Sequence, residues 1–79
     1  MKINVQYFAK LREERGLSNE TLNSEAKTAL ELFNEIKEKY HFSMSHENLR
    51  VAVNEEFCEW DSTLKDNDMI VFIPPVAGG

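Results

Sequence analysis

The chain is poor in cysteine, in positive charge and in long apolar runs. Cys58 is its only cysteine, so no intramolecular disulfide can form, and a reducing compartment is expected. Nine Lys and Arg stand against 14 Asp and Glu, and the net charge of −5 disfavours nucleic acid and anionic membranes as partners. No apolar run approaches the length of a membrane span, and the first residues do not resemble a signal peptide. We therefore expect a cytoplasmic protein whose partners present basic surfaces.

The chain is also short. Seventy-nine residues make one small domain, which buries only about 60% of its unfolded surface, so a carrier or binding role is favoured over an independent enzyme. An apolar fraction of 42% is typical of a globular fold. There is no glycine-rich phosphate loop, and His41 and His46 lack the further ligands that a metal site needs. We predict no metal site and no permanently bound cofactor.

The few prolines and glycines are concentrated at the end of the chain. Its last six residues are Pro74, Pro75, Val76, Ala77, Gly78 and Gly79. Proline favours extended backbone at its own position and the one before it, and six extended residues reach about 20 Å. Glycine has no Cβ, so its backbone can enter a slot that a side chain would block. We interpret residues 74–79 as a stiff stalk that carries the Gly79 carboxylate into a partner's active site; the alternative is a disordered terminus.

The pattern of apolar and polar residues in 1–73 predicts one α+β domain. In chain order we expect a strand at 2–8, a short helix at 9–15, an edge strand within 17–24, a long helix at 29–40, strands at 49–53 and 57–60, and a strand at 69–73. Thr28 and Glu31 form a capping box at the start of the long helix. The unbroken apolar run at 69–73 is typical of a strand buried on both faces.

The first and last strands are the most apolar, so we place them side by side and parallel in the centre of a mixed sheet. One main helix then crosses one face of this sheet, which is the β-grasp, or ubiquitin-like, arrangement, with the tail of residues 74–79 protruding from it. The residues expected to form the core between sheet and helix are Ile3, Val5, Tyr7, Val51, Val53, Ile70, Phe72, Leu32, Phe33 and Ile36.

The long helix covers only one face of the sheet, which leaves four apolar residues without an assigned neighbour: Phe8, Phe57, Val71 and Ile73. Uncovered apolar residues that cluster mark an interaction surface. Because Ile73 lies at the base of the tail, a partner docked on this surface would also aim the stalk. The alternative is that short loops and the first helix cover these residues. Trp60 is expected to pack beneath the loop that follows it.

The one reactive group that the sequence suggests is the carboxylate of Gly79. A carboxylate is a poor electrophile at neutral pH, and the usual biological activation is an acyl adenylate made from ATP. The chain has no recognisable ATP site, so another protein must supply this step. A sulfur donor then gives a thiocarboxylate, whereas a lysine gives an isopeptide bond. Cys58 lies in an expected strand, where a cysteine is usually a packing residue.

The residues at the end of the chain resemble a known family. The ending 72–79, FIPPVAGG, is similar to that of the small, sulfur-carrying subunit of molybdopterin synthase, the MoaD family. Residues 7–13 resemble the first strand and helix of that family, and residues 51–54 resemble its third strand and hairpin. Residues 66–68 read Asp-Asn-Asp where family members often have Asp-Gly-Asp. The resemblance covers essentially the whole chain.

The resemblance implies a role for each part of the tail. An ATP-dependent adenylyltransferase would adenylate Gly79, a sulfur donor would convert it to a thiocarboxylate, and the sulfur would pass to cyclic pyranopterin monophosphate. The tail would act inside the large subunit of molybdopterin synthase, in a heterotetramer with a central dimer of large subunits. Gly79 would carry the chemistry and Gly78 would give access. Pro74, Pro75, Val76 and Ala77 would form the stalk, while Phe8, Phe57 and Ile73 would dock the large subunit.

Three alternatives stay open at this point. The chain could be a ubiquitin-like modifier that forms isopeptide bonds to lysines, although a short, stiff stalk favours one dedicated partner over many targets. It could carry sulfur for another pathway. It could also be a plain β-grasp binding module with an inert tail, in which case removal of Gly79 would leave its function intact.

Overall fold

The computed structural model describes residues 1–74, and Pro75, Val76, Ala77, Gly78 and Gly79 lie outside this description. The elements in chain order are β1 (Lys2–Tyr7), α1 (Ala9–Arg15), β2 (Asn19–Asn23), α2 (Ala29–Tyr40), a 3-10 turn (His46–Asn48), β3 (Arg50–Val53), β4 (Glu56–Cys58) and β5 (Met69–Ile73). This is the order that the sequence predicts. The fourth strand is shorter than expected, because it ends at Cys58 and Trp60 lies in the turn that follows.

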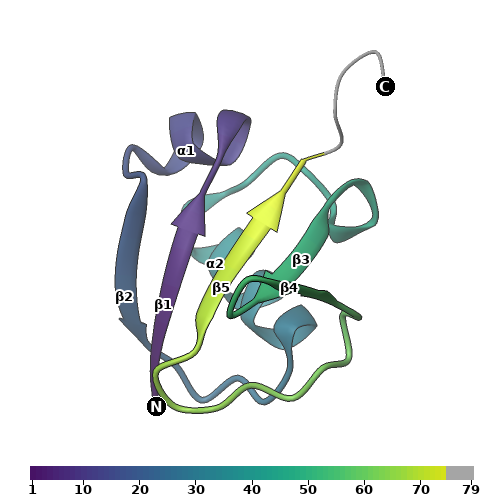
Figure 1. Ribbon diagram of the computed structural model, residues 1–79. Coiled ribbons are helices and arrows are strands. Elements are labelled where there is room, and N and C mark those ends of the chain that lie inside the picture. The colour runs from purple at the N-terminus through teal and green to yellow at the C-terminus, as the bar shows by residue number, and fades with distance from the viewer. Residues whose placement is uncertain (75–79) are drawn as a thin grey trace.

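The strands form one five-stranded sheet in the order β2-β1-β5-β3-β4 (Figure 1). The central strands β1 and β5 run parallel, with Tyr7 opposite Phe72. The other three pairings, β1–β2, β3–β5 and β3–β4, are antiparallel. The predicted parallel pair at the centre of a mixed sheet is therefore confirmed, and so is the edge position of β2.

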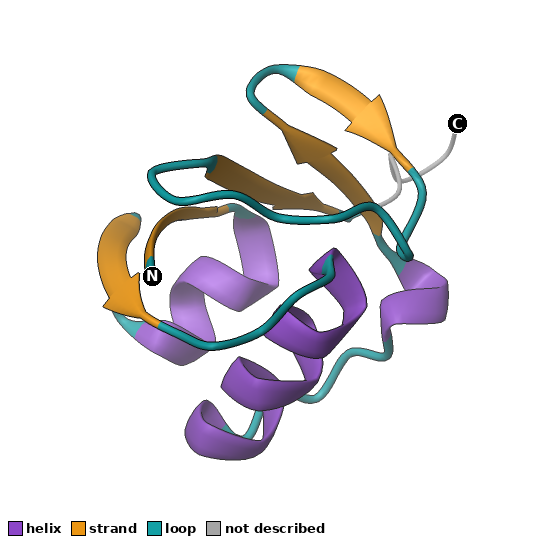
Figure 2. Ribbon diagram, turned by 90° about the horizontal axis from the view of Figure 1, so that it is seen from below, coloured by secondary structure: helices purple, strands orange, loops and turns teal. Residues whose placement is uncertain are grey.

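Both helices lie on the same side of the sheet (Figure 2). Between sheet and helices the core holds alternate strand residues, among them Val5, Ile70 and Phe72, packed with Leu32 and Phe33 of α2. The alternation follows from strand geometry, which sends successive side chains to opposite faces. All of the expected core residues are buried there except Val53, which is only partly buried. Trp60 stacks on Phe72 and meets the edge of Phe33, so its predicted packing role is confirmed.

The expectation that the last strand is buried on both faces is wrong. Ile70 and Phe72 are fully buried, whereas Met69, Val71 and Ile73 are only partly buried. The reason is the single helical layer: within residues 1–74 no helix lies on the second face of the sheet, so alternate residues of β5 stay partly accessible there. The unbroken apolar run thus has one face in the core and one face outside it.

Local signals set the helix ends as expected. The Thr28 hydroxyl oxygen accepts a hydrogen bond from the Glu31 backbone N–H at 3.2 Å. The Glu31 carboxylate reaches back to the backbone N–H of Lys27 at 3.1 Å, one residue before the N-cap, so the capping box is a close variant of the usual one. Gly16 ends α1 with a φ of 80°, the left-handed conformation that glycine adopts without a Cβ clash.

Three residues, Asn54, Glu55 and Asn67, have positive φ angles in the turns before β4 and β5. Asn54 and Glu55 connect β3 to β4 with φ values of 52° and 73°, which fits a two-residue hairpin of the I′ type. The Asn54 side chain also accepts a hydrogen bond from the backbone N–H of Met69 and donates one to Asp68, both at 2.9 Å. Asn67, in the place of the family's glycine, has a φ of 70°. Asparagine tolerates this conformation better than most residues, so the turn that leads into β5 forms without a glycine at position 67.

Candidate functional site

No helix of the described residues covers the face of the sheet opposite α2, and we call it the open face. Strand register identifies its residues, because neighbours across strands point to the same side. It is formed by Lys2, Asn4 and Gln6 of β1, Asn19, Thr21 and Asn23 of β2, Arg50 and Ala52 of β3, Phe57 of β4, and Met69, Val71 and Ile73 of β5. Its β2–β1 half is polar, and its β5–β3–β4 half is mostly apolar.

A row of apolar side chains crosses this second half. Ala52 is in register with Phe57 on one side and with Val71 on the other. Phe57 is 57% exposed, the largest exposure among the described large hydrophobic residues. A large aromatic ring left in water beside other apolar groups is typical of a docking surface. Of the alternative covers, α1 lies on the other side of the sheet with Leu11 in the core, and Phe8 and Phe57 are left exposed.

The base of the tail lies at one end of the same surface. Ile73 is the last residue of β5, and its Cα partner on β3 is Arg50. Tyr7 is opposite Phe72, so Phe8 leaves the parallel pair at the end where Ile73 leads into Pro74 (Figure 1). The Phe8 side chain is 40% exposed. The fold thus brings Phe8, Ile73 and Pro74 together at the exit of β5, while Phe57 lies on the edge strand β4, which β3 separates from β5.

The residue after Phe8 holds an unusual backbone conformation. Ala9 has a φ of 51°, in the left-handed region, where a residue with a Cβ loses roughly 1–2 kcal/mol. Phe8 has extended backbone, and α1 starts at the next residue, Ala9, so the chain turns sharply between the two. The sharp change of direction takes α1 to the covered side of the sheet and leaves the Phe8 ring accessible.

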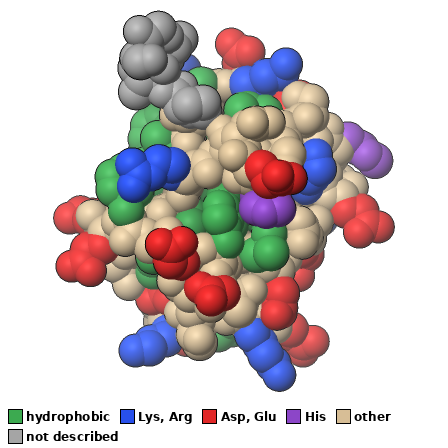
Figure 3. Space-filling view, turned by 90° about the vertical axis from the view of Figure 1, so that its right-hand side faces the viewer, with side chains coloured by type: hydrophobic (Ala, Val, Ile, Leu, Met, Phe, Trp, Pro, Cys, Tyr) green, Lys and Arg blue, Asp and Glu red, His purple; other side chains and the backbone are tan. Residues whose placement is uncertain are grey.

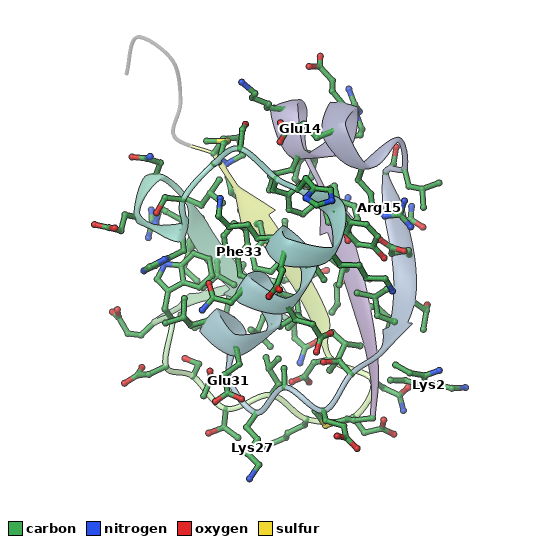
Figure 4. The ribbon with its side chains drawn as sticks, turned by 180° about the vertical axis from the view of Figure 1, so that it is seen from behind. Lys2, Glu14, Arg15, Lys27, Glu31 and Phe33 are labelled. Carbon is green, nitrogen blue, oxygen red and sulfur yellow. The ribbon has the colours of Figure 1, made fainter. Side chains whose placement is uncertain are left out.

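The other end of α1 is fixed by a polar cluster that sequence reasoning missed. The Glu20 carboxylate accepts hydrogen bonds from Arg15 Nε at 2.7 Å and from the Tyr7 hydroxyl at 2.6 Å. The Arg15 guanidinium carbon also lies 3.9 Å from the ring centroid of Tyr40 on α2. These contacts tie α1 to β1, β2 and α2 (Arg15 is labelled in Figure 4). Because the partners lie on four different elements, no periodic pattern in the sequence indicates them.

The cluster shifts the ionisation of its members. Hydrogen bonding to Arg15 holds the pKa of the Glu20 carboxyl below its ordinary value. Burial, reinforced by the hydrogen bond to Glu20, raises the pKa of the Tyr7 hydroxyl well above its ordinary value. The cluster therefore keeps Glu20 charged and Tyr7 neutral at physiological pH. Its role is to position α1 and the end of β1, with Phe8 between them.

The remaining candidates for chemistry are packing residues. The Cys58 thiol is partly exposed and lies 3.9 Å from the backbone oxygen of Val51. His46 packs edge-on against the Trp60 ring. Residues 1–74 contain no cluster of three or more His, Cys, Asp or Glu that is placed to hold a metal ion. A hollow of about 310 Å³ lies beside Met1, Ala26 and Leu64, at the pole away from the exit of β5.

No helix in the described part of the chain combines the length and apolarity that a membrane crossing requires. Five of the predicted site residues, Pro75, Val76, Ala77, Gly78 and Gly79, lie outside the described residues. Their roles in the stalk and in the chemistry stay predictions, and so does the docking role of Phe8, Phe57, Ile73 and Pro74. The structure places these four residues on one accessible surface, which ends where β5 leads into the tail.

A mixed five-stranded sheet with a central parallel pair and one long helix across one face defines a ubiquitin-like β-grasp protein. Within this class, the ThiS family model matches residues 5–79, and the chain belongs to the ThiS family. A curated relative, the molybdopterin synthase sulfur carrier subunit of Haemophilus influenzae, is 31% identical over 80 residues, which cover 98% of this chain and 99% of that protein.

Two solved structures extend the comparison. A putative molybdopterin converting factor, subunit 1, from Pyrococcus furiosus has a TM-score of 0.81 at 30% identity and covers 96% of this chain and 99% of its own. A chain in the complex of subunits 1 and 2 of the molybdopterin-converting factor from Helicobacter pylori has a TM-score of 0.71 at 28% identity, and the match covers 100% of both chains. The resemblance to small subunits of molybdopterin synthase is therefore confirmed at the level of family and fold.

Proposed function

We propose that this chain is the sulfur carrier subunit of molybdopterin synthase. The observation that carries the proposal is the position of the tail: residues 74–79, with their Gly-Gly tip, follow a strand whose last residue belongs to an exposed apolar surface. A surface of this kind can hold a partner while the stalk enters that partner's active site. The 31% identity to a sulfur carrier subunit over nearly the full length of both chains supports the same role.

The chemistry begins at the Gly79 carboxylate. An oxygen of this group attacks the α-phosphorus of ATP in the active site of an adenylyltransferase and displaces pyrophosphate, which gives an acyl adenylate. A hydrosulfide equivalent from a sulfur donor then attacks the acyl carbon and displaces AMP, which gives a thiocarboxylate. Neither the adenylate nor the thiocarboxylate is a permanent cofactor. The chain supplies the acyl group and a narrow tip, and the partner enzymes supply the catalysts.

The acceptor in this proposal is cyclic pyranopterin monophosphate, held by the large subunit. The thiocarboxylate sulfur attacks an oxygen-bearing carbon of the pterin side chain, and the C–O bond at that carbon breaks, so that its oxygen leaves as water or on the opened phosphate ester. Water then cleaves the acyl–sulfur bond and restores the Gly79 carboxylate. Because a dithiolene contains two sulfurs, two charged carriers are consumed per pterin. The carrier thus acts only in combination with the large subunit, and we assign the pair to a cytoplasmic heterotetramer with a central dimer of large subunits.

The large subunit is proposed to dock on the apolar half of the open face, against Phe8, Phe57 and Ile73. Aromatic residues that are exposed in the free protein and buried in a complex often dominate the binding energy. The Helicobacter pylori complex, in which a chain of this fold is joined to subunit 2 of its molybdopterin-converting factor, supports a partner of this kind. Docking so close to Pro74 would leave the stalk pointing into the partner.

The experiment that tests the function is intact-mass measurement after incubation with ATP, the candidate adenylyltransferase and a sulfur donor. We expect a gain equal to the replacement of one oxygen by sulfur, mapped to Gly79, and no gain in a variant that lacks Gly79. No gain with an adenylyltransferase that charges another carrier would overturn the proposal. Addition of the chain to protein lysines, without any thiocarboxylate, would favour a protein modifier instead.

A further inference from the structure

Within the described strands, no carboxylate lies on the open face, although the chain has 14 Asp and Glu against nine Lys and Arg. The two acidic residues within the described strands are Glu20 of β2 and Glu56 of β4. They are in register with Val5 and Val53 respectively, so both belong to the helix-covered side of the sheet. The described strands thus contribute only positive charge to the open face, from Lys2 and Arg50, and the Asp66 carboxylate that binds the Lys2 backbone N–H lies at the Lys2 end.

Arg50 is the cation that lies beside the base of the tail. Its Cα pairs directly with that of Ile73, the last residue of β5. Lys2 lies at the opposite end of the face, where its Cα pairs with that of Asn23 on β2. Within residues 1–74 the Arg50 side chain has neither an ion pair nor a hydrogen bond, whereas Arg15 is held by Glu20. Arg50 therefore places a positive charge without a carboxylate partner next to the exit of the stalk.

The Arg50 side chain does have one partner, the Phe57 ring. The guanidinium carbon lies 3.9 Å from the centroid of this ring, well within cation–π distance. Figure 3 shows a basic side chain lying against hydrophobic side chains at one edge of the view. Stacking occupies a face of the guanidinium, and its N–H groups lie in the guanidinium plane, so they stay available for a bidentate carboxylate. The contact also limits the rotamers of Arg50 before a partner binds.

We propose that Arg50 is the charge anchor of the docking surface and that it recognises a carboxylate on the large subunit, next to an apolar pocket that takes the Phe57 ring. This inference rests on the proposed function, which supplies the large subunit as partner. The anionic substrate is a poor alternative partner for Arg50, because the proposed function assigns it to Gly79, six residues beyond Ile73 in the chain. A protein carboxylate at the docking surface is the anion within reach.

The test is the affinity of the full chain for the large subunit, measured by calorimetry at several salt concentrations. Arg50→Gln removes the charge, Arg50→Glu reverses it, and Lys27→Gln is the matched control, because Lys27 lies at the pole away from the exit of β5 (labelled in Figure 4). We expect Arg50→Gln to bind about tenfold more weakly with a shallower salt dependence, and Arg50→Glu about a hundredfold more weakly. The control should stay within about twofold of the unchanged chain.

Arg50 is exposed, so these variants should keep the fold, which circular dichroism and thermal unfolding would check. Unchanged affinity and salt dependence in Arg50→Gln, with normal binding of the unchanged chain, would overturn the inference and leave the proposed function intact. A charge swap would identify the partner carboxylate: a Glu→Arg or Asp→Arg change in the large subunit should restore its binding to the Arg50→Glu chain. No binding by the unchanged chain would overturn the proposed partner itself, and with it this inference.

Discussion

The Tyr7 hydroxyl donates a 2.6 Å hydrogen bond to the Glu20 carboxylate, which also binds Arg15. Tyr7 is the last residue of the central strand β1, and Arg15 is the last residue of α1. The cluster therefore fixes β1 and α1 relative to each other. Phe8 connects these two elements and lies at the edge of the proposed docking surface. A contact on the covered side of the sheet thus holds in place a residue on the accessible side.

The first prediction concerns this cluster. Glu20→Gln should destabilise the fold by about 1–2 kcal/mol, because it replaces a charged acceptor of three short hydrogen bonds by a neutral amide. Urea unfolding followed by fluorescence would measure the change in the free energy of unfolding. Glu13→Gln, at an exposed position of α1, is the control and should change it by less than about 0.5 kcal/mol. Equal losses in the two variants would mean that the cluster adds no stability.

The second prediction concerns acid. The pKa of Glu20 is lower in the folded chain than its ordinary value near 4.5, so the unfolded chain binds the proton more readily. Its contribution to stability is therefore complete above about pH 4.5 and is lost as the pH falls through the folded pKa. Glu14, whose pKa is lowered by hydrogen bonding to Ser43, adds to the same trend.

Unfolding free energies measured from pH 7 down to pH 2 should consequently fall less steeply in Glu20→Gln than in the unchanged chain. The difference should appear only below about pH 4.5, the ordinary value for this carboxyl. A Glu20→Gln profile parallel to that of the unchanged chain over the whole range would contradict the assigned pKa shift.

The third prediction separates docking from folding at Phe8. Phe8→Glu should weaken binding of the large subunit by about tenfold or more and leave the unfolding midpoint nearly unchanged, because the ring is 40% exposed in the free chain. Leu17→Glu is a matched control: its side chain is 42% exposed and belongs to the connection between α1 and β2, outside the strands that form the open face. If both variants bind as well as the unchanged chain, Phe8 is not part of the docking surface.

The fourth prediction concerns the tip. Gly78→Val should fold normally, because position 78 lies beyond the domain of residues 1–73, yet it should fail to transfer sulfur since its side chain would block a narrow slot. Val76→Ile, which enlarges a residue that already has a Cβ, is the control. The readout is molybdopterin formed by the reconstituted synthase from pre-charged carrier. Normal product formation by Gly78→Val would remove the argument for a narrow slot.

Much of the fold could be predicted from local patterns. The alternation of Ile3, Val5 and Tyr7 set the covered face of β1, and Thr28 set the start of α2, because both effects act over a few neighbouring residues. The parallel pairing of β1 with β5 followed from their shared apolar character. The sequence was misleading for β5, where a continuous apolar run indicated burial on both sides, whereas Met69, Val71 and Ile73 are only partly buried on the face that α2 does not cover.

The amino-acid sequence by itself determined the order of the elements, the caps and turns, and the chemistry offered by a Gly-Gly tip on a proline stalk, because each depends on the nearest residues in the chain. Only the tertiary structure decided which side chains meet. Strand register placed Arg50 beside Ile73 and over Phe57, and the packing of α1 brought Arg15 to Glu20 and Tyr40. Such contacts depend on the pairing and packing of whole elements, which no short sequence window contains.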